Sequence, residues 1–288
     1  MNQNNPPLVS VVIPCYNHEN FVQDSIQSVI NQTYQNIELI IIDDGSKDGS
    51  VEKIQEMISV CQERFIRFEF RHRPNKGLSA TLNEALEWCQ GIYYSAIASD
   101  DMMLPGKTKL QVEFLDTHEN ISAVFGGIEL IDNNNIKISE RVRQSKQYRF
   151  KDIILHQHDL PAPTQMIRLS ALKRVGGYDP DIVIEDWYMW IKLSELGDLY
   201  YMDHLLCLYR QHATNISKNL EKMRQGRAKV LSFYKDSDLY QLAILEAEWV
   251  HLIELRTYKI KDFKFSIICF FIKNPIFVFN KVYRKYYE

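Results

Sequence analysis

Two pairs of adjacent carboxylates, Asp43-Asp44 and Asp100-Asp101, are the first candidates for a ligand-binding site. Each pair directly follows a short apolar run that is typical of a buried β-strand. Ligands of open parallel α/β sheets bind beyond the carboxyl ends of the strands, so both pairs would place negative charge where a ligand sits. Because like charges repel unless a cation or a hydrogen-bonding ligand compensates them, the sequence predicts a metal–nucleotide site. The alternative for Asp43-Asp44, which precede Gly45 and Ser46, is an ordinary turn.

The elements that must position these carboxylates alternate between strand and helix over roughly the first hundred residues. The apolar runs and helical spacings predict strands over 8–14, 38–42, 65–70 and 93–98 and helices over 21–30 and 78–89. Such alternation is typical of βαβ units. We therefore predict an α/β fold with a Rossmann-like, mostly parallel central sheet flanked by helices.

The pattern is less regular after residue 103. We expect helices over 107–115, from 170 to the stop at Gly176-Gly177 and over 186–196, strands over 123–131 and 165–168, and a turn at 132–135. Beyond Tyr209 the chain becomes helical and polar, which predicts a C-terminal helical appendage.

The composition excludes several classes of protein. A net charge of −3 gives no basic field for nucleic acid. Neither G-x-G-x-x-G nor a P-loop motif occurs, which weakens dinucleotide-binding and P-loop interpretations. The five widely spaced cysteines support neither a disulfide framework nor a zinc ribbon, and the N-terminus lacks the pattern of a signal peptide. These features favour a cytoplasmic protein.

The tail, residues 257–288, differs from the rest of the chain. It holds 10 of the 34 aromatic residues and carries seven basic against two acidic side chains, so its charge opposes that of residues 1–256. This composition predicts contact with a membrane surface, where aromatics enter the lipid boundary and cations meet anionic headgroups. The alternative is a helical hairpin packed on protein. Pro275 interrupts the apolar stretch, which argues against a spanning helix.

A series of short motifs in fixed order makes residues 8–217 resemble the family 2 glycosyltransferases, which have the GT-A fold. The motifs are Pro14-Cys15-Tyr16-Asn17, Asp43-Asp44-Gly45-Ser46, Asn75-Lys76-Gly77-Leu78, Ala98-Ser99-Asp100-Asp101, Glu185-Asp186-Trp187 and Tyr209-Arg210-Gln211-His212. The resemblance implies an inverting, metal-dependent hexosyltransferase that uses a nucleotide sugar. It also implies a GT-A domain over 1–217, with a nucleotide-binding part over about 8–101 and an acceptor part over about 102–217. The helical region predicted over 218–288 lies outside the resemblance.

The resemblance assigns the donor site to residues of the first three motifs. Pro14 and Tyr16 match positions that line the nucleoside pocket, where an aromatic face can stack. Asp44 matches the carboxylate that accepts a hydrogen bond from a pyrimidine ring nitrogen, which favours uridine or thymidine diphosphate sugars. Lys76 matches a residue near the nucleotide, and a solvated loop lysine is an equally fair interpretation.

The metal and diphosphate ligands follow from the same resemblance. Asp100 and Asp101 match the end of the family's metal motif and suit Mn²⁺ or Mg²⁺, and either of them could touch the ion. Ala98 stands where many relatives have another aspartate. Arg210 would present its fork of donors to phosphate oxygens, and His212 would bind phosphate or the metal.

The last functional motif supplies the catalytic acids. Asp186 matches the general base that deprotonates the acceptor hydroxyl, and Glu185 would hold Asp186 or contact the acceptor. Taken alone, Asp186 is an ordinary helix-start carboxylate. Trp187 is predicted to form a platform for the acceptor sugar.

These expectations describe an enzyme that adds one hexose or N-acetylhexosamine to a lipid-linked or polysaccharide acceptor. The resemblance favours a UDP-sugar as the donor. The Gln-x-x-Arg-Trp signature of processive relatives is absent. Family analogy suggests O-antigen or other surface-polysaccharide biosynthesis at the inner face of the cell membrane. The alternatives are a non-catalytic nucleotide-sugar-binding or scaffolding protein of the same fold, and a peripheral membrane protein whose tail is its function.

Overall fold

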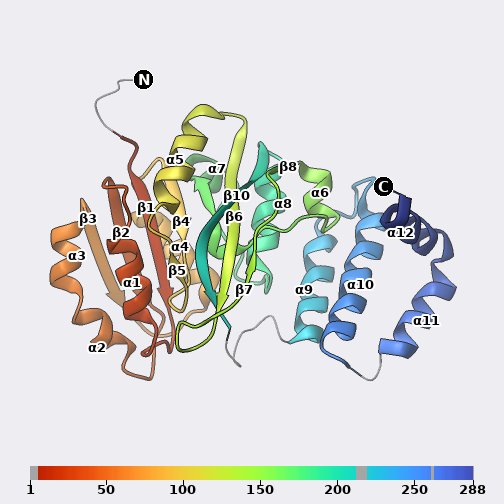
Figure 1. Ribbon diagram of the computed structural model, residues 1–288, viewed down its shortest axis with the longest axis horizontal. Helices are drawn as coiled ribbons and strands as arrows, with labels where there is room; N and C mark the ends of the chain where they lie inside the picture. The colour runs from red at the N-terminus through yellow and green to blue at the C-terminus, as the bar shows by residue number, and fades with distance from the viewer. Residues whose placement is uncertain (1–5, 212–218, 261–262, 288) are drawn as a thin grey trace. The chain divides into compact units, whose positions relative to one another are not determined.

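A central sheet with helices on both faces forms the larger part of the computed structural model (Figure 1). Residues 6–211, 219–260 and 263–287 are described, with side chains to residue 281. Within them the sheet has the strand order β3-β2-β1-β4-β9-β6-β10-β5, with β7 paired to β6 and β8 to β10. The strands are β1 (Val9–Cys15), β2 (Ile37–Asp43), β3 (Arg67–His72), β4 (Tyr93–Ala96), β5 (Met102–Met103), β6 (Ile121–Ile131), β7 (Lys137–Arg141), β8 (Lys146–Tyr148), β9 (Met166–Arg168) and β10 (Asp198–Arg210).

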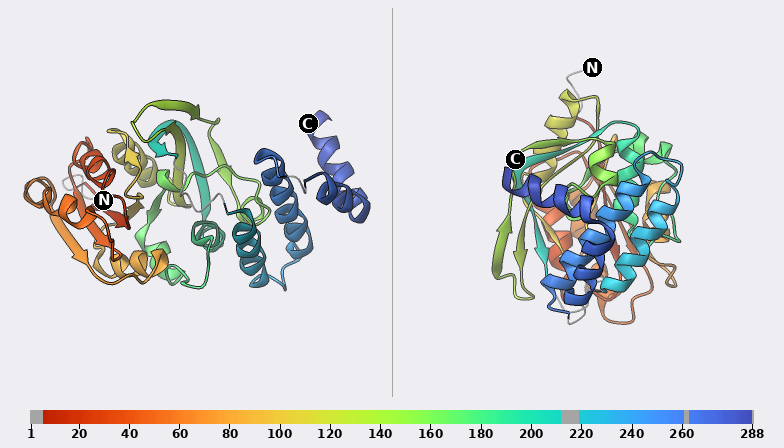
Figure 2. Two further views of the ribbon diagram at one scale, coloured as in Figure 1. Left: turned by 90° about the horizontal axis from the view of Figure 1, so that it is seen from below. Right: turned by 90° about the vertical axis from the view of Figure 1, so that its right-hand side faces the viewer.

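The helices of this part lie between the strands in the chain. They are α1 (Val22–Ile30), α2 (Ser50–Gln55), α3 (Ile58–Arg64), α4 (Leu78–Trp88), α5 (Lys107–Thr117), α6 (Phe150–Ile154), α7 (Leu169–Arg174) and α8 (Glu185–Ser194), with a 3₁₀ turn at Ala162–Thr164. Helices α1, α3 and α5 pack in one apolar core with alternate residues of β1 and β2. Helix α8 places Trp190 against Phe125 of β6, and Figure 2 shows helices on both sides of the sheet.

The first four strands run parallel, which confirms the βαβ prediction for the first hundred residues. In this register Cys15 lies opposite Asp43, Asp43 opposite His72, and Val12 opposite Ala96. The carboxyl ends of β1, β2, β3 and β4 therefore meet at one edge. That edge receives every motif of the first hundred residues.

The second half of the sheet is mixed. β9 runs antiparallel to β4 and β6, whereas β10 runs parallel to β6 and antiparallel to β5 and β8. The predicted turn at 132–135 is present, with Asn135 at a φ of 62°. Helix α7 ends before Gly176 and Gly177, which have φ values of 84° and 73°, as the sequence predicted.

The chain divides into two compact units. One consists of residues 1–153, 158–181 and 185–215, and the other of residues 154–157, 182–184 and 216–288. The domain boundary predicted at 217–218 lies outside the described residues. The second unit contains α9 (Leu220–Ser232), α10 (Tyr240–Thr257), α11 (Phe263–Lys273) and α12 (Pro275–Tyr287).

The described helices include no single one that is both long and apolar enough to cross a bilayer. Only α11 together with α12 as far as Lys281 reaches the necessary length and composition, and the two are bent by 106°.

Candidate active site

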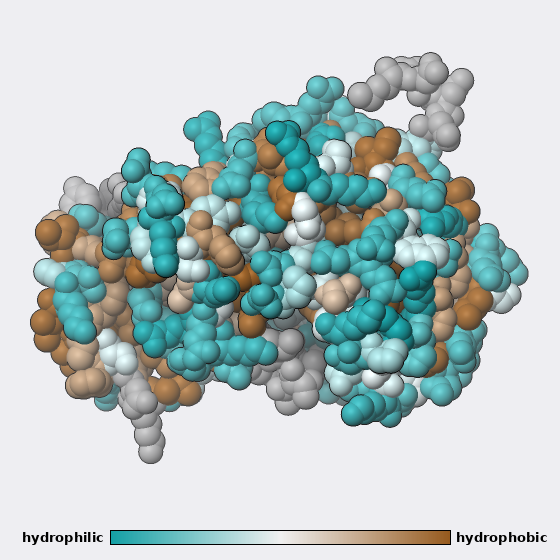
Figure 3. All heavy atoms as spheres, turned by 180° about the vertical axis from the view of Figure 1, so that it is seen from behind, coloured by the Kyte–Doolittle hydropathy of each residue, from teal (hydrophilic) through white to brown (hydrophobic). Residues whose placement is uncertain are grey.

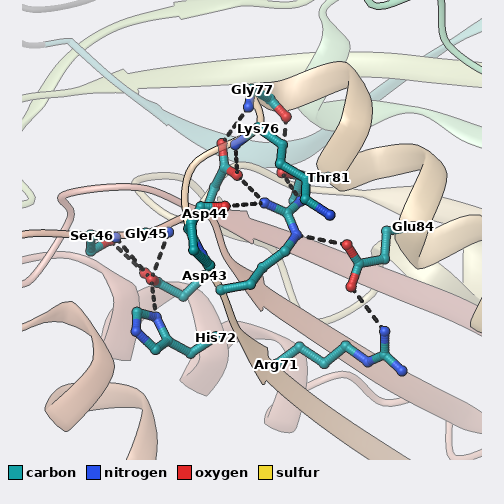
Figure 4. Close-up of polar contacts among 12 residues, drawn as sticks. Asp43, Asp44, Gly45, Ser46, Arg71, His72, Lys76, Gly77, Thr81 and Glu84 are labelled. Atoms are coloured by element: carbon teal, nitrogen blue, oxygen red, sulfur yellow. Dashed lines mark hydrogen bonds and ion pairs between the residues drawn. The ribbon is translucent and has the colours of Figure 1, made fainter.

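A hydrogen-bonded cradle holds Asp44 at the end of β2 (Figure 4). Its buried carboxylate accepts hydrogen bonds from the backbone N–H groups of Lys76 (2.8 Å) and Gly77 (2.9 Å). It also forms an ion pair with Arg73. Arg73 also donates to Glu84 (2.6 Å) and to Thr81 Oγ1 (2.9 Å), both on α4. Three donors around one carboxylate fix its position. Sequence reasoning placed Asp44 here and missed Arg73.

The neighbouring Asp43 shapes the turn that the sequence left open as the alternative for this pair. One of its oxygens accepts hydrogen bonds from the backbone N–H groups of Gly45 (3.1 Å) and Ser46 (2.9 Å), and His72 Nδ1 lies 2.8 Å from the same oxygen. Gly45 has a φ of 76°, and a Cβ there would lie 2.6 Å from the backbone N of Asn75. The turn chemistry of this motif therefore supports the cradle of Asp44.

The other predicted donor residues lie on the rim of the same edge. Pro14 is half-buried and the side chain of Tyr16 is 43% exposed, immediately after β1. The backbone N–H of Asp44 donates to the carbonyl of Cys15 (2.8 Å), which brings the two motifs together. Lys76 touches Asp44 only through its backbone N–H among the described contacts, and its side chain is exposed.

Asp100 and Asp101 differ in their surroundings, although they are adjacent at the end of β4. Asp101 is 2% exposed, and its Oδ1 accepts the backbone N–H of Arg210 (2.9 Å). Burial raises the pKa of Asp101 well above its ordinary value, and the charge of Asp100 raises it further. Asp100 is partly exposed, and His18 Nε2 lies 3.8 Å from its Oδ2. His18 Nδ1 lies 2.7 Å from Ser99 Oγ, so this histidine bridges the loop after β1 and the acidic motif.

Arg210 lies beside the acidic motif at the end of β10. Its side chain is fully buried: Nε donates to the carbonyl of Asp100 (2.9 Å) and Nη1 to that of Asp132 (2.9 Å). The guanidinium carbon lies 4.5 Å from the ring centre of Phe21, and Nη2 lies 3.4 Å from Asp24 Oδ2. In the described part of the chain the guanidinium is enclosed by protein and binds these protein acceptors, and its contact with a diphosphate stays a prediction. His212, two residues further on, lies outside the described residues.

Glu185 and Asp186 form the first turn of α8, and both are partly exposed. Asp186 Oδ1 accepts the backbone N–H of Trp187 (2.6 Å). Burial raises the pKa of Asp186, against the lowering effect of that hydrogen bond. Burial also raises the pKa of Glu185, and the charge of Asp186 adds to the rise. The result is a carboxyl pair that binds protons more tightly than ordinary acids do.

Trp187 is 1% exposed, and its Nε1 donates to the carbonyl of Ile153 (2.9 Å). A ring buried in this way presents no face to a sugar, so the structure does not support the platform predicted from the sequence. The side chain instead anchors the start of α8 in the core.

A residue that sequence reasoning missed fixes the segment before the acid pair. Asn83 of α4 donates from Nδ2 to the carbonyl of Tyr178 (2.7 Å), and the backbone N–H of Tyr178 donates back to Asn83 Oδ1 (2.8 Å). A Cβ on Gly177 would lie 2.5 Å from the same Oδ1, so glycine is required there. Helix α4, which begins at the cradle of Asp44, therefore also holds the chain that leads to Glu185.

Comparison with known proteins identifies the family. Residues 10–176, more than half of the chain, match the model described as Glycosyl transferase family 2. The chain belongs to this family. As a member it is 28% identical over 240 residues to the UDP-Glc:alpha-D-GlcNAc-diphosphoundecaprenol beta-1,3-glucosyltransferase WfgD of Escherichia coli, a match that covers 83% of this chain and 90% of WfgD. It spans only 31% and 36% of the length of two uncharacterised glycosyltransferases of Rickettsia bellii and Rickettsia felis.

Solved structures show that this family 2 member has the GT-A fold that the sequence predicted. Mannosyltransferase PcManGT from Pyrobaculum calidifontis, in complex with GDP-Man and Mn²⁺, matches with a TM-score of 0.65 at 13% identity, over 88% of this chain and 76% of that one. S. aureus TarS, in complex with UDP-GlcNAc, matches with a TM-score of 0.61 at 16% identity, over 86% and 81%.

The donor set at the end of β4 of this family 2 protein fits a hard divalent cation. Two adjacent carboxylates repel each other, and the raised pKa of Asp101 expresses that repulsion together with burial. Mn²⁺ and Mg²⁺ commonly bind through one or two carboxylates and complete their shell with waters and phosphate oxygens. Among the described residues no cluster of three or more His, Cys, Asp and Glu side chains could hold a metal, so Asp100 and Asp101 would depend on such added ligands.

Proposed function

We propose that this chain is an inverting glycosyltransferase that moves one hexose or N-acetylhexosamine from a nucleotide sugar to a lipid-linked or polysaccharide acceptor. The observation that carries the proposal is the acid pair at the start of α8. Asp186 is partly exposed and its pKa is raised, so its carboxylate is a stronger base than an ordinary aspartate. The parallel strand ends supply the donor side of the same unit.

The donor is a pyrimidine nucleotide sugar, a UDP-sugar, in this proposal. Asp44 is the only one of the predicted donor residues whose carboxylate is held by a preformed cradle, and Oδ2 accepts one hydrogen bond among the described contacts, from Gly77. Its second lone pair can accept the ring N–H of a uracil. Pro14 and Tyr16 would line the nucleoside pocket, and Lys76 would lie at its rim.

The reaction is a single displacement. Asp186 accepts the proton of the acceptor hydroxyl as that oxygen bonds to the anomeric carbon. The bond between the anomeric carbon and the donor phosphate oxygen breaks at the same time, and the configuration at the carbon inverts. Glu185 assists by holding a proton beside Asp186, because its own pKa is raised by burial.

Asp100 and Asp101 would hold Mn²⁺ or Mg²⁺ together with the diphosphate, and His212 is a further candidate ligand. When bound, such an ion stabilises the negative charge that develops on the departing diphosphate. The partial exposure of Asp100 supports it as the direct ligand. Asp101, buried and bonded to the backbone of Arg210, would fix the end of the motif.

One relative supports the proposed acceptor class. WfgD is named for a diphosphoundecaprenol-linked acceptor, and it matches over most of both chains. We place this enzyme in a surface-polysaccharide pathway of the O-antigen type, at the cytoplasmic face of the membrane, with residues 257–288 as its contact. A non-catalytic scaffold of the same fold would need neither Asp100-Asp101 nor Glu185-Asp186.

Calorimetric titration of UDP, TDP and GDP, each with Mn²⁺ and with EDTA, tests the donor site. The proposal expects binding of the pyrimidine diphosphates that is strongly weakened by EDTA, and loss of UDP binding in Asp44→Ala. Preferential binding of GDP would overturn the donor assignment, and failure of every nucleotide to bind would overturn the proposed function.

A further inference from the structure

Helix α11 is apolar on two opposite faces, although it lies at the surface of its unit. Its inner face contributes Phe270, which packs in a small core with Leu252 and Leu255 of α10 and with Phe277 of α12. The ring of Trp249 lies 6.0 Å from that of Phe270. This core accounts for one apolar face of α11 and gives no reason for the other.

The outer face carries large side chains that the unit does not cover. Phe265, Ile268 and Ile272 are 74%, 58% and 75% exposed, and Ile276 at the start of α12 is 76% exposed. The spacing of 265, 268 and 272 places them on one side of a helix. Figure 3 shows hydrophobic side chains, in brown, gathered on the surface of the C-terminal helices at the left of the view. We call these four residues the outer face.

The charge around the outer face has one sign. No aspartate or glutamate occurs from Phe263 to Tyr287. Lys264 and Lys273 of α11 are both exposed, and they lie next to the outer-face residues Phe265 and Ile272. Exposed apolar side chains on a helix whose charged residues are all cationic are complementary to a bilayer with anionic headgroups. Such a helix is poorly complementary to a second copy of itself, because a symmetric contact would bring like charges together.

We propose that the outer face inserts into the headgroup–acyl boundary of an anionic bilayer, with α11 lying in the plane of the membrane. The bend of 106° between α11 and α12, and the engagement of Phe270 and Phe277 in the core, oppose a spanning arrangement. Lys264 and Lys273 then meet lipid phosphates. This deepens the proposed function, on which it rests for the presence of a lipid-linked acceptor, and it assigns the membrane contact to particular side chains.

Co-sedimentation of the full chain with vesicles tests the proposal. We expect binding to phosphatidylglycerol-containing vesicles that exceeds binding to pure phosphatidylcholine vesicles by about tenfold or more. Ile268→Ser with Ile272→Ser should lower the affinity for the anionic vesicles by at least about tenfold. The matched control is Ile66→Ser with Ile138→Ser, two isoleucines that are 70% and 54% exposed in the other unit, and it should bind as the wild type does.

The variants also separate charge from apolar insertion. Lys264→Gln with Lys273→Gln should remove most of the preference for anionic over neutral vesicles. Equal vesicle binding by wild type and Ile268→Ser/Ile272→Ser overturns the proposal. A lipid-free dimer that the same two substitutions dissociate also overturns it, since the outer face would then be an interface between copies.

UDP titration of the same proteins distinguishes this inference from the proposed function. Loss of vesicle binding with unchanged UDP affinity confirms that the outer face acts apart from the donor site. Vesicle binding without any nucleotide binding would contradict the transferase and leave the membrane contact standing.

Discussion

Among single residues, the partly exposed Asp186 has a raised pKa in the folded protein. Its ionisation therefore destabilises the fold at neutral pH. A carboxyl group whose pKa is higher in the folded state stabilises that state below its unfolded pKa, and this contribution is lost as the pH rises through the folded pKa. Asp186→Asn keeps the oxygen that accepts the Trp187 N–H and removes the charge. We expect it to raise the free energy of unfolding at pH 7.5 by about 0.5–2 kcal/mol.

Urea unfolding at pH 7.5 and at pH 4 measures this effect. The gain should shrink toward the lower pH, where the wild-type carboxyl is protonated as well. A gain of the same size at both values would mean that the charge of Asp186 is not its source.

Arg210 gives a second prediction about a single residue. Arg210→Met leaves the carbonyls of Asp100 and Asp132 without their buried donors, and each unpaired group costs about 1–3 kcal/mol. Denaturant unfolding should therefore show a loss of roughly 2–6 kcal/mol. If instead Arg210→Met kept the wild-type stability and lost affinity for UDP but not for uridine, that result would support the predicted contact with the diphosphate.

The types and order of the residues were enough to predict where the acidic residues lie in the fold. They did not predict which of the neighbouring side chains are buried. Asp44, Asp100 and Asp186 lie where strand ends and a helix start were predicted. Arg210 and Trp187 were assigned to ligands because their side chains suit phosphate and sugar, yet both are enclosed in the core. The Arg210 side chain points inward because β10 runs beside Asp101 and the backbone N–H of Arg210 binds its carboxylate. The sequence pattern does not show this pairing.

Among the elements, α4 links the cradle of Asp44 to the segment before the proposed catalytic acids through the two hydrogen bonds between Asn83 and Tyr178. Asn83→Ala should loosen the chain that leads to Glu185 and Asp186. We expect kcat to fall about 10-fold to 100-fold, as misplacement of catalytic groups does, with UDP affinity changed less than twofold. Steady-state kinetics and calorimetry measure the two quantities.

The matched control is Glu87→Ala, on the exposed side of the same helix. It should leave kcat unchanged. Equal losses of kcat and UDP affinity in Asn83→Ala would show that the substitution damages α4 as a whole rather than the position of the acid pair.

Strong hydrophobic periodicity predicted the elements of the first hundred residues, and weak periodicity hid others. Helices α2 and α3 are only six and seven residues long, too short to show a clear stripe. Strand β10 is 13 residues long, but Asp203 and His204 interrupt its apolar pattern, and its pairing with β6 shifts register there. The hydrogen bonds between Asn83 and Tyr178 could not be predicted from a local sequence pattern, because the two residues are 95 positions apart.

For the whole molecule, the proposed lipid-linked acceptor and the proposed membrane contact of α11 together predict that transfer depends on the vesicle surface. Ile268→Ser with Ile272→Ser should lower the rate of transfer to a lipid-linked acceptor in anionic vesicles by about tenfold or more. Transfer to a water-soluble acceptor analogue should be unchanged. Equal losses on both acceptors would show that the substitutions disturb the catalytic unit.

Turnover of the Asp186→Asn variant tests whether Asp186 is the base of an inverting transfer. With UDP-glucose, Mn²⁺ and a GlcNAc-diphospho-lipid acceptor, proton NMR of the wild-type product should show the anomeric configuration opposite to that of the donor. Asp186→Asn should bind UDP with wild-type affinity and turn over about 10²–10⁴-fold more slowly. Normal turnover by Asp186→Asn, or a wild-type product that retains the donor configuration, would contradict the account.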